Sequence, residues 1–228
     1  MTNTLRAILV TALVSFSAAA SANLFVIDLI DGVNPLPIPG NQAYTGQLGD
    51  DFTVLSAIDI TSVGLFDSLG NGTVNRLTWQ LFNVATGNLV HEQTIAGTGP
   101  RAPGAGIAAN YAWAAPTVSL SLAPGVYSVV GVGFSNSDPN FNTNFDLINL
   151  DVVHNNIALT AAGGRYSNEG VTAGLPTNGA GNTASNQAYN FGAASFQYRV
   201  QQVPSPGTLS LLIFGLAAIG QVKRLRRA

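Results

Sequence analysis

The sequence predicts an all-β protein: an antiparallel β-sandwich or jelly roll, with a signal peptide before it and a transmembrane helix after it. Two observations predict this fold class. Apolar and polar residues alternate in several short segments, and a period of two residues is that of a half-buried strand. Clusters of Gly, Asn and Pro separate these segments, and the middle of the chain shows no helical period. Strands without intervening helices favour antiparallel sheets.

The first element is a secretory signal peptide over residues 1–22. Arg6 gives the positively charged start, a short apolar core follows, and Ala20 and Ala22 are the small residues of a cleavage site. We expect signal peptidase to cut after Ala22, so that Asn23 becomes the mature N-terminus. The apolar core is too short for an uncleaved membrane anchor.

Residues 23–202 are expected to form one sandwich ectodomain. Its expected strands cover residues 24–30, 51–55, 58–66, 77–82, 89–95, 118–122, 126–134, 145–153 and, as an edge strand, 195–200. Within the third of these, the apolar positions change parity between Ile60 and Val63, which predicts a kink near Thr61 and Ser62. Long segments rich in Gly, Ala and Asn are expected to be loops, and these cover residues 97–109 and 163–189.

Two hairpins are expected among these strands. Gly87 and Asn88 tolerate a positive φ, so the strands on either side of them should pair. Pro124 and Gly125 fit the central positions of a type II turn, so residues 118–134 should form the second hairpin. Within the expected strand over 77–82, Trp79 shares a face with Leu77 and Leu81, which predicts that its side chain lies in the core.

The ectodomain is acidic and has no lysine. It holds four arginines against all eleven acidic residues of the chain, which gives a net charge of −7. Nucleic-acid binding is excluded, because phosphate contacts need clustered basic residues. The chain has no cysteine, so disulfides, cysteine zinc sites and thiol nucleophiles are excluded as well.

An Asn-rich stretch carries the metal candidates. Oxygen-bearing side chains occupy every second position there, namely Asp138, Asn140, Asn142, Asn144 and Asp146. Such spacing is typical of a calcium loop, but Thr143 and Asn149 stand where an EF-hand needs Gly and Glu. A solvated loop is the favoured interpretation, and calcium is the alternative. No other cofactor is expected.

Catalytic candidates are few. His91 and His154 each stand alone, and no G-x-S-x-G marks a nucleophile. A Ser-His-Asp triad stays open as an alternative, because triads are set by geometry and not by spacing. Asp50 and Asp51 could supply half of a glycosidase pair, but adjacent acids at a strand entrance are more often solvated. Aromatic rings that could stack on a sugar are Trp79, Tyr111, Trp113 and Tyr127. We therefore expect no catalytic residue and no enzymatic activity.

The last element is a tail over residues 203–228. Val203, Pro204, Ser205 and Pro206 come first, and an uncharged apolar run over 207–222 follows. Pro206 suits the first turn of a helix. A basic end closes the chain with Lys223, Arg224, Arg226 and Arg227. Cations behind an apolar run stay cytoplasmic, so this helix should cross the inner membrane and leave the ectodomain outside.

The order, spacing and terminal position of these three parts resemble the PEP-CTERM sorting signal of Gram-negative bacteria. That family has a Pro-Glu-Pro motif, and Ser205 stands here in place of the Glu. The resemblance implies an exosortase-like transpeptidase as a partner. Residues 50–134 are also similar to the β-sandwich region common in these proteins. The matching parts are, in order, the strand ending at 63–67, the 77–82 strand, the turn at Gly87 and Asn88, the Trp113 segment and residues 122–127.

Three functions remain open at this stage. The first is a non-enzymatic exported protein, held at the inner membrane or sorted to the envelope or extracellular matrix, with exopolysaccharide as a candidate partner. The second is a carbohydrate-binding module that uses exposed aromatic rings, with or without calcium. The third is a secreted hydrolase, which only the large exported sandwich favours.

Overall fold

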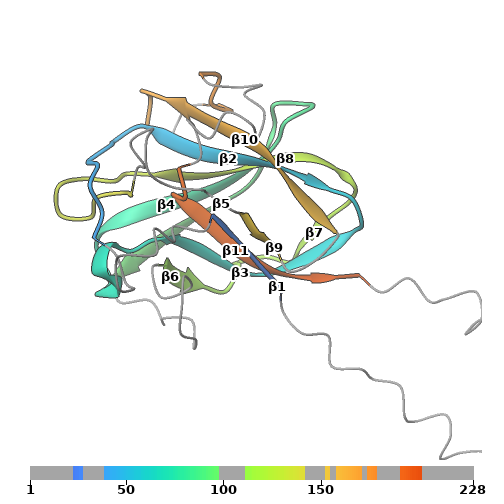
Figure 1. The fold of residues 1–228 in the computed structure, drawn as a ribbon, viewed down its shortest axis with the longest axis horizontal. Helices are drawn as coiled ribbons and strands as arrows, with labels where there is room; N and C mark the ends of the chain where they lie inside the picture. The colour runs from blue at the N-terminus through green and yellow to red at the C-terminus, as the bar shows by residue number, and fades with distance from the viewer. Residues whose placement is uncertain are drawn as a thin grey trace, which may run out of the picture.

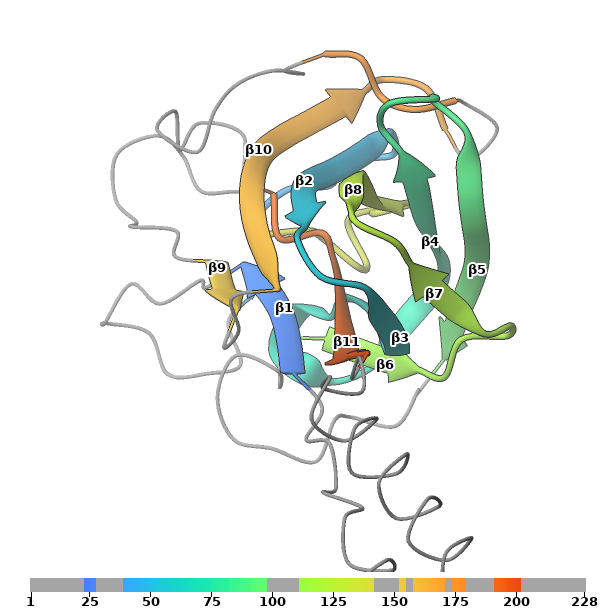
Figure 2. The same ribbon diagram turned by 90° about the vertical axis from the view of Figure 1, so that its right-hand side faces the viewer.

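The fold consists of two antiparallel sheets that face each other (Figures 1 and 2). The computed structural model describes residues 23–27, 39–97, 111–141, 152–154, 158–170, 174–178 and 191–201. All the strand pairs in this part of the chain are antiparallel, which confirms the all-β prediction. Among the described residues, no helix has the length and apolar character needed to cross a bilayer. The segments expected to be the signal peptide and the tail lie outside the described residues.

The five-stranded sheet has the order β10-β2-β8-β4-β5. Its strands are β2 (Gln47–Val54), β4 (Thr73–Asn83), β5 (Leu89–Gly97), β8 (Gly125–Val132) and β10 (Leu159–Ser167). The six-stranded sheet has the order β6-β3-β11-β1-β9. β7 pairs with the first residues of β3 and β6 pairs with its last residues. Its strands are β1 (Asn23–Ile27), β3 (Ile58–Phe66), β6 (Tyr111–Ala114), β7 (Leu120–Leu122), β9 (Val152–His154) and β11 (Ala194–Val200). A short 3-10 helix, η1 (Ser68–Gly70), lies between β3 and β4.

The expected kink in β3 is a β-bulge. Ser62 pairs with Gln197 of β11, and Ile60 pairs with the next residue, Tyr198, so Thr61 is the extra residue. A bulge shifts the alternation by one position. It therefore lets Ile60 and Val63, which differ in parity, both be buried. The change of parity in the sequence was a correct signal.

One expected hairpin is present. β4 and β5 pair across the turn at residues 84–88, where the Asn83 N–H donates to the Asn88 carbonyl at 2.9 Å. Gly87 has a φ of 71°, the left-handed conformation that favours glycine.

The prediction of a second hairpin, over 118–134, is wrong. β7 pairs with β3 in the six-stranded sheet, whereas β8 pairs with β2 and β4 in the five-stranded sheet. The chain thus crosses between the sheets at Ala123 and Pro124 instead of folding back on itself. The Tyr127 hydroxyl donates to the Ala123 carbonyl at 3.1 Å and fixes this corner. Turn chemistry predicted the change of direction but not the partner of each strand.

Two strands were missed and one was misplaced. β10 runs through Gly163 and Gly164, which the sequence analysis assigned to a loop; Gly163 has a φ of 112° and lies where the register with β2 shifts. β6 was not predicted as a strand. β11 was expected at an edge but lies between β3 and β1. Most of the strand expected over 145–153 lies outside the described residues.

The core fills the space between the sheets. Its fully buried large side chains come from both sheets and include Phe52, Leu77, Trp79, Leu81, Val63, Leu65, Phe196 and Tyr198. Trp79 of β4 reaches across the sandwich, and its indole N–H donates to the Ser195 carbonyl of β11 at 2.9 Å. The predicted core position of Trp79 is confirmed.

Candidate functional site: a polar cavity over the outer face of the five-stranded sheet

The acidic pair in β2 is buried, not solvated as expected. Only 2% of Asp50 and 6% of Asp51 is exposed. Because successive strand residues point to opposite faces, Asp50 shares the inner face with the core residue Phe52, and Asp51 lies on the outer face. The strand begins earlier than predicted, at Gln47, so the two acids lie inside it instead of at its entrance.

Asp50 secures the chain just before β11. Its carboxyl oxygens accept hydrogen bonds from the backbone N–H groups of Phe191 at 3.0 Å and Gly192 at 3.2 Å. Burial raises the pKa of Asp50 to about 8, against the lowering effect of the N–H donors, and the neighbouring Asp51 adds to the rise. The Tyr111 hydroxyl donates to the Gly192 carbonyl at 2.8 Å, so the same segment is held from both sheets.

Asp51 forms a buried ion pair with Arg165 of β10. The guanidinium binds both carboxylate oxygens, with Nε 2.6 Å from Oδ1 and Nη2 on Oδ2. Nη1 also donates to the Pro176 carbonyl at 2.9 Å. Two parallel donors from one guanidinium give a fixed geometry as well as charge compensation. The pair therefore anchors Pro176 above the sheet.

The segment over residues 174–178 crosses the outer face of the five-stranded sheet. Besides the Pro176 contact, the Gly174 carbonyl accepts from Gln47 Nε2 at 3.1 Å, and Asn178 forms a two-way backbone bridge with Tyr166. Leu175 packs on an apolar cluster of Phe82, Val130 and Val132. Polar contacts at both ends and an apolar contact between them hold this segment over the sheet.

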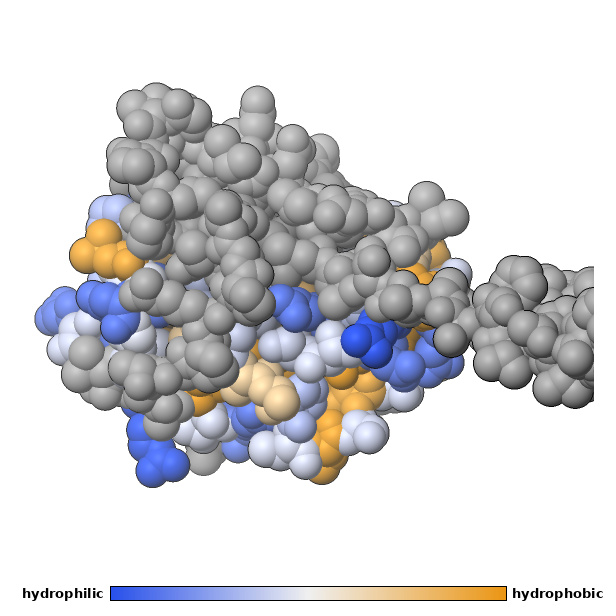
Figure 3. Space-filling model, turned by 90° about the horizontal axis from the view of Figure 1, so that it is seen from below, coloured by the Kyte–Doolittle hydropathy of each residue, from blue (hydrophilic) through white to orange (hydrophobic). Residues whose placement is uncertain are grey.

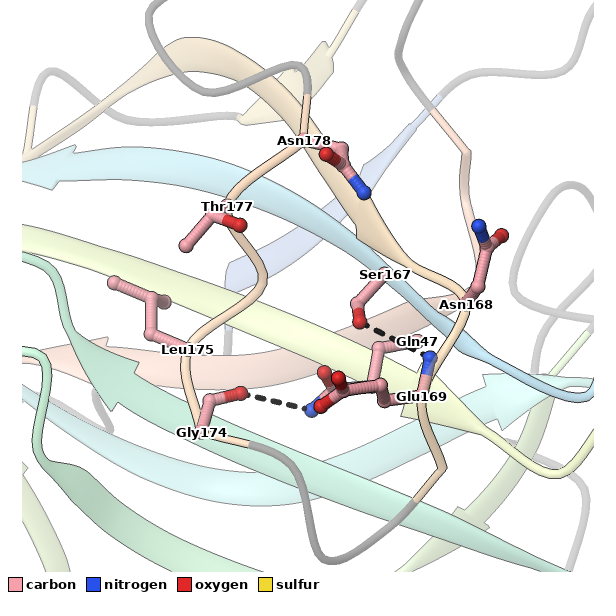
Figure 4. A pocket seen from close by; sticks show the side chains of 8 residues that line it. All are labelled: Gln47, Ser167, Asn168, Glu169, Gly174, Leu175, Thr177 and Asn178. Carbon is pink, nitrogen blue, oxygen red and sulfur yellow. Dashed lines mark hydrogen bonds between the residues drawn. The ribbon is translucent and has the colours of Figure 1, made fainter.

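A polar cavity of about 280 Å³ lies between this segment and the end of β10. Figure 4 shows the side chains at the end of β10 on one side, the 174–178 segment on the other and Gln47 between them. The lining residues are Gln47, Ser167, Asn168, Glu169, Gly174, Leu175, Thr177 and Asn178. The register of β10 with β2 places Ser167 directly opposite Gln47, which brings the two chain segments together.

A row of amides and a carboxylate runs from the cavity across the sheet. Gln47 Nε2 donates to Gln80 Oε1 at 3.0 Å, and Gln80 Nε2 donates to Glu92 Oε2 at 2.8 Å. Gln47 is fully buried, yet its Oε1 has no hydrogen-bond partner within the described part of the chain. At the rim, the Tyr44 hydroxyl lies 2.8 Å from Asn168 Oδ1 and fixes that side chain.

The aromatic residues considered for sugar stacking are all buried. Trp79 lies in the core, Trp113 covers Gly64 of β3, Tyr111 is bonded to Gly192, and Tyr127 stacks on Phe52 at 5.9 Å. None of the four therefore offers a ring face to a ligand.

The stretch considered for calcium is folded where the structure describes it, instead of solvated. Asp138 and Asn140 are buried, and Asn140 pairs with Gln42 through two backbone hydrogen bonds of 2.8 and 2.9 Å. The Asn140 side-chain N–H donates to the carbonyls of Phe141 at 2.9 Å and Phe191 at 3.4 Å. Asn142, Asn144 and Asp146 lie outside the described residues. Within the described ranges, no three His, Asp or Glu side chains gather at one point.

The two histidines do not come together with the acids. His91 Nε2 lies 3.4 Å from Thr117 Oγ1, and its ring lies beside Trp79 with centroids 6.2 Å apart. His154 ends β9, opposite Phe25 of β1. The sorting motif and basic end (Val203 to Pro206 and Lys223 to Arg227) and the signal residues Ala20 and Ala22 lie outside the described residues. Asn23, the predicted mature N-terminus, is the first residue of β1.

Sequence reasoning missed the cavity, because its residues fall at the start of β2 and in a predicted loop. The one available signal was the alternation of Gln47, Gly49 and Asp51 with Leu48 and Phe52, which marks a polar outer face. Comparison with known proteins adds no relative: no family model, curated protein or solved structure matches this chain.

Proposed function

We propose that this chain is an exported protein without catalytic activity, held at the inner membrane by its C-terminal helix. Residues 23–202 would lie outside the cytoplasm, and an exosortase-like transpeptidase would sort the protein to the envelope or extracellular matrix. The proposal rests on the two terminal segments, 1–22 and 203–228, and on their resemblance to known export and sorting signals.

One structural observation carries the proposal: the first and last strands of the fold are neighbours. Asn23 of β1 pairs with Tyr198 of β11 in an antiparallel ladder. Cleavage after Ala22 would leave β1 complete, and β11 ends at Val200, shortly before the predicted tail. Both terminal signals would therefore leave the folded domain at the same end of two paired strands. Such an arrangement leaves the sandwich intact whether either signal is present or removed.

Absence of catalysis is proposed from the use that the fold makes of its acids. Asp50 binds backbone N–H groups, and Asp51 is paired with Arg165. Both acids are thus occupied by structural contacts, whereas glycoside hydrolysis requires a pair of acids that face the substrate. A screen of the mature protein against polysaccharides, with release of reducing ends as the readout, tests the alternative of a secreted hydrolase.

Topology is tested by reporter fusions. A reporter that is active only in the cytoplasm should be active after Ala228, and one that is active only in the periplasm should be active when it replaces residues 203–228. The reverse pattern would overturn the proposal. A variant that changes the four basic residues of the tail to Gln is the control, because it should lose the fixed orientation.

Carbohydrate binding is the second candidate function. Burial of the four aromatic residues removes the stacking platform that the sequence suggested. What favours this function is the polar cavity beside Gln47, whose lining offers hydroxyl, amide and carboxylate groups.

A further inference from the structure

Hydrogen bonds fix the Gln47 side chain beside the cavity. Gln47 Nε2 donates one hydrogen bond to Gln80 Oε1 and another to the Gly174 carbonyl. These two bonds fix the orientation of the amide. The Gln47 side chain is fully buried, so the hydrogen-bonding groups that are open to a ligand belong to the other lining residues.

Charge excludes one class of ligand. Among the described residues of the lining, Glu169 is the only charged one, and the nearby Arg165 is occupied by Asp51 and the Pro176 carbonyl. Phosphates, sulfates and carboxylates would therefore meet a carboxylate and acceptor oxygens without a compensating cation. Two kinds of ligand fit this lining: a hydroxyl-rich molecule, which donates hydrogen bonds to its oxygens, or a cation, which the oxygens coordinate.

The size of the cavity decides between a hydroxyl-rich molecule and a cation. Calcium is held by six to eight oxygens at about 2.3–2.6 Å, which needs a much tighter shell than this cavity provides. The cavity volume of about 280 Å³ is close to the lower end of small-molecule pockets, at roughly 300 Å³. One sugar ring is a ligand of that scale.

The lining also matches the two sides of a sugar ring. Ser167, Thr177, Asn168 and Asn178 supply groups that both donate and accept, as neighbouring sugar hydroxyls require. Leu175 supplies an apolar surface for the C–H side of the ring, and it is itself supported by Phe82, Val130 and Val132.

We propose that this cavity binds one neutral sugar unit, with its hydroxyls bonded by Glu169, Thr177 and Asn178. This inference rests on the second candidate function and names the site and the ligand class for it. It does not depend on where the tail directs the protein.

The test uses the full chain in lauryldimethylamine oxide, a detergent without a sugar headgroup. Methyl glucoside, methyl galactoside, methyl mannoside and N-acetylglucosamine are titrated at millimolar concentrations and followed by saturation-transfer NMR. We expect at least one of them to bind. Thr177→Val and Asn178→Ala should each weaken that binding roughly two- to tenfold, the range for loss of one hydrogen bond. The matched changes Thr94→Val and Asn136→Ala, at exposed residues outside the cavity, should leave it unchanged.

Three results would overturn the proposal. If a glycan array binds the protein but the cavity variants bind as well as the parent, the site is elsewhere and carbohydrate binding itself survives. If neither the array nor the four probes bind, both the site and the second candidate function fail. If calcium chloride binds and Glu169→Gln abolishes that binding while the sugars give no signal, the cavity is a cation site. The reporter fusions at Ala228 are independent of all three results.

Discussion

The indole N–H of Trp79 donates to the Ser195 carbonyl, so that a side chain of one sheet is hydrogen-bonded to the backbone of the other. The ring is fully buried, and it joins β4 to the bulged pairing of β3 and β11 through the middle of the core. Trp79 thus buries a large apolar ring and also makes a hydrogen bond between the two sheets. Its substitution is therefore the strongest single test of the sandwich.

Trp79→Ala should destabilise the protein by about 3–5 kcal/mol, the range for removing a large buried aromatic side chain. Denaturant unfolding of the full chain, followed by circular dichroism, measures this change in the free energy of unfolding. Leu89→Ala on the neighbouring strand is the control, because Leu89 is exposed and its loss should cost within about 0.5 kcal/mol. A loss for Trp79→Ala as small as that of the control would mean that the ring faces solvent.

Asp50 should make the folded protein less stable as the pH rises. Its pKa in the folded state is about 8 and its model value is 3.8, so the folded state holds a proton that the unfolded state has released. The stability that this proton provides is fully present below pH 4 and is lost as the pH rises to about 8. The slope in this window should approach about 1.4 kcal/mol per pH unit. Asp50→Asn, measured by denaturant unfolding across this window, should remove that slope.

Asp59→Asn is the control for this experiment. The side chains of Ser121 and Gln201 donate to Asp59 and lower its pKa, so its effect on stability is lost only as the pH falls below the usual carboxyl range. The Asp59 variant should therefore keep the slope between pH 4 and 8. If Asp50→Asn also kept it, the Asp50 carboxylate would have to be ionised in the folded protein at neutral pH.

The buried ion pair predicts an asymmetric double-mutant cycle. Arg165→Met should cost about 3–5 kcal/mol, because it leaves the Asp51 carboxylate buried without its partner. The double variant with Asp51→Leu should recover much of that loss, since a well-packed apolar pair avoids the desolvation cost. Arg165→Lys should not rescue, because an ammonium cannot bind both Asp51 oxygens and the Pro176 carbonyl in the same fork. Equal stability of the single and double variants, measured by denaturant unfolding, would contradict this account.

Gly64 should tolerate no side chain, since Trp113 lies directly over it. A Cβ on Gly64 would come within 2.8 Å of the Trp113 ring atoms Cε3 and Cζ3. Gly64→Ala should therefore displace the ring and cost about 1–3 kcal/mol by overpacking, as thermal unfolding would show. Gly170→Ala is the matched control, because a Cβ there meets nothing within 4 Å. A neutral effect at Gly64 would show that Trp113 is free to move.

The residues that the sequence predicted well are those where a single local rule applied. The change of parity between Ile60 and Val63 predicted a bulge, and Trp79 followed from plain alternation. Strand partners were not predictable, because pairing of β7 with β3 and of β8 with β2 depends on contacts between distant segments. The prediction for Asp50 was wrong because an acidic residue is more common at the exposed start of a strand than at an inward-facing position within it. The cavity escaped prediction because it joins Gln47 to residues 167–178, which composition alone marks as a loop.

The described part of the surface that faces down in Figure 1 shows no single large apolar patch. Apolar residues lie there in separate groups among polar ones (Figure 3). The exposed large apolar residues of the described chain also come from separate segments: Leu55, Leu69, Leu89, Val90, Val118 and Val126. Isolated residues of this kind are normal on a protein surface and need no partner.

The last prediction concerns the tail, where topology and processing have different grounds. Topology follows from four cations behind an uncharged run, and processing follows from the resemblance of Val203, Pro204, Ser205 and Pro206 to a sorting motif. Because β11 ends at Val200, cleavage near Pro204 would remove no strand residue and should leave the unfolding midpoint of the ectodomain unchanged. Epitope tags before Val203 and after Ala228 should separate into two polypeptides in cells that carry an exosortase and stay together in cells that lack one. If they stay together in both, the tail is a permanent anchor. Ser205→Glu then shows the reason: separation of the tags on restoring the acid would identify the missing carboxylate as the cause.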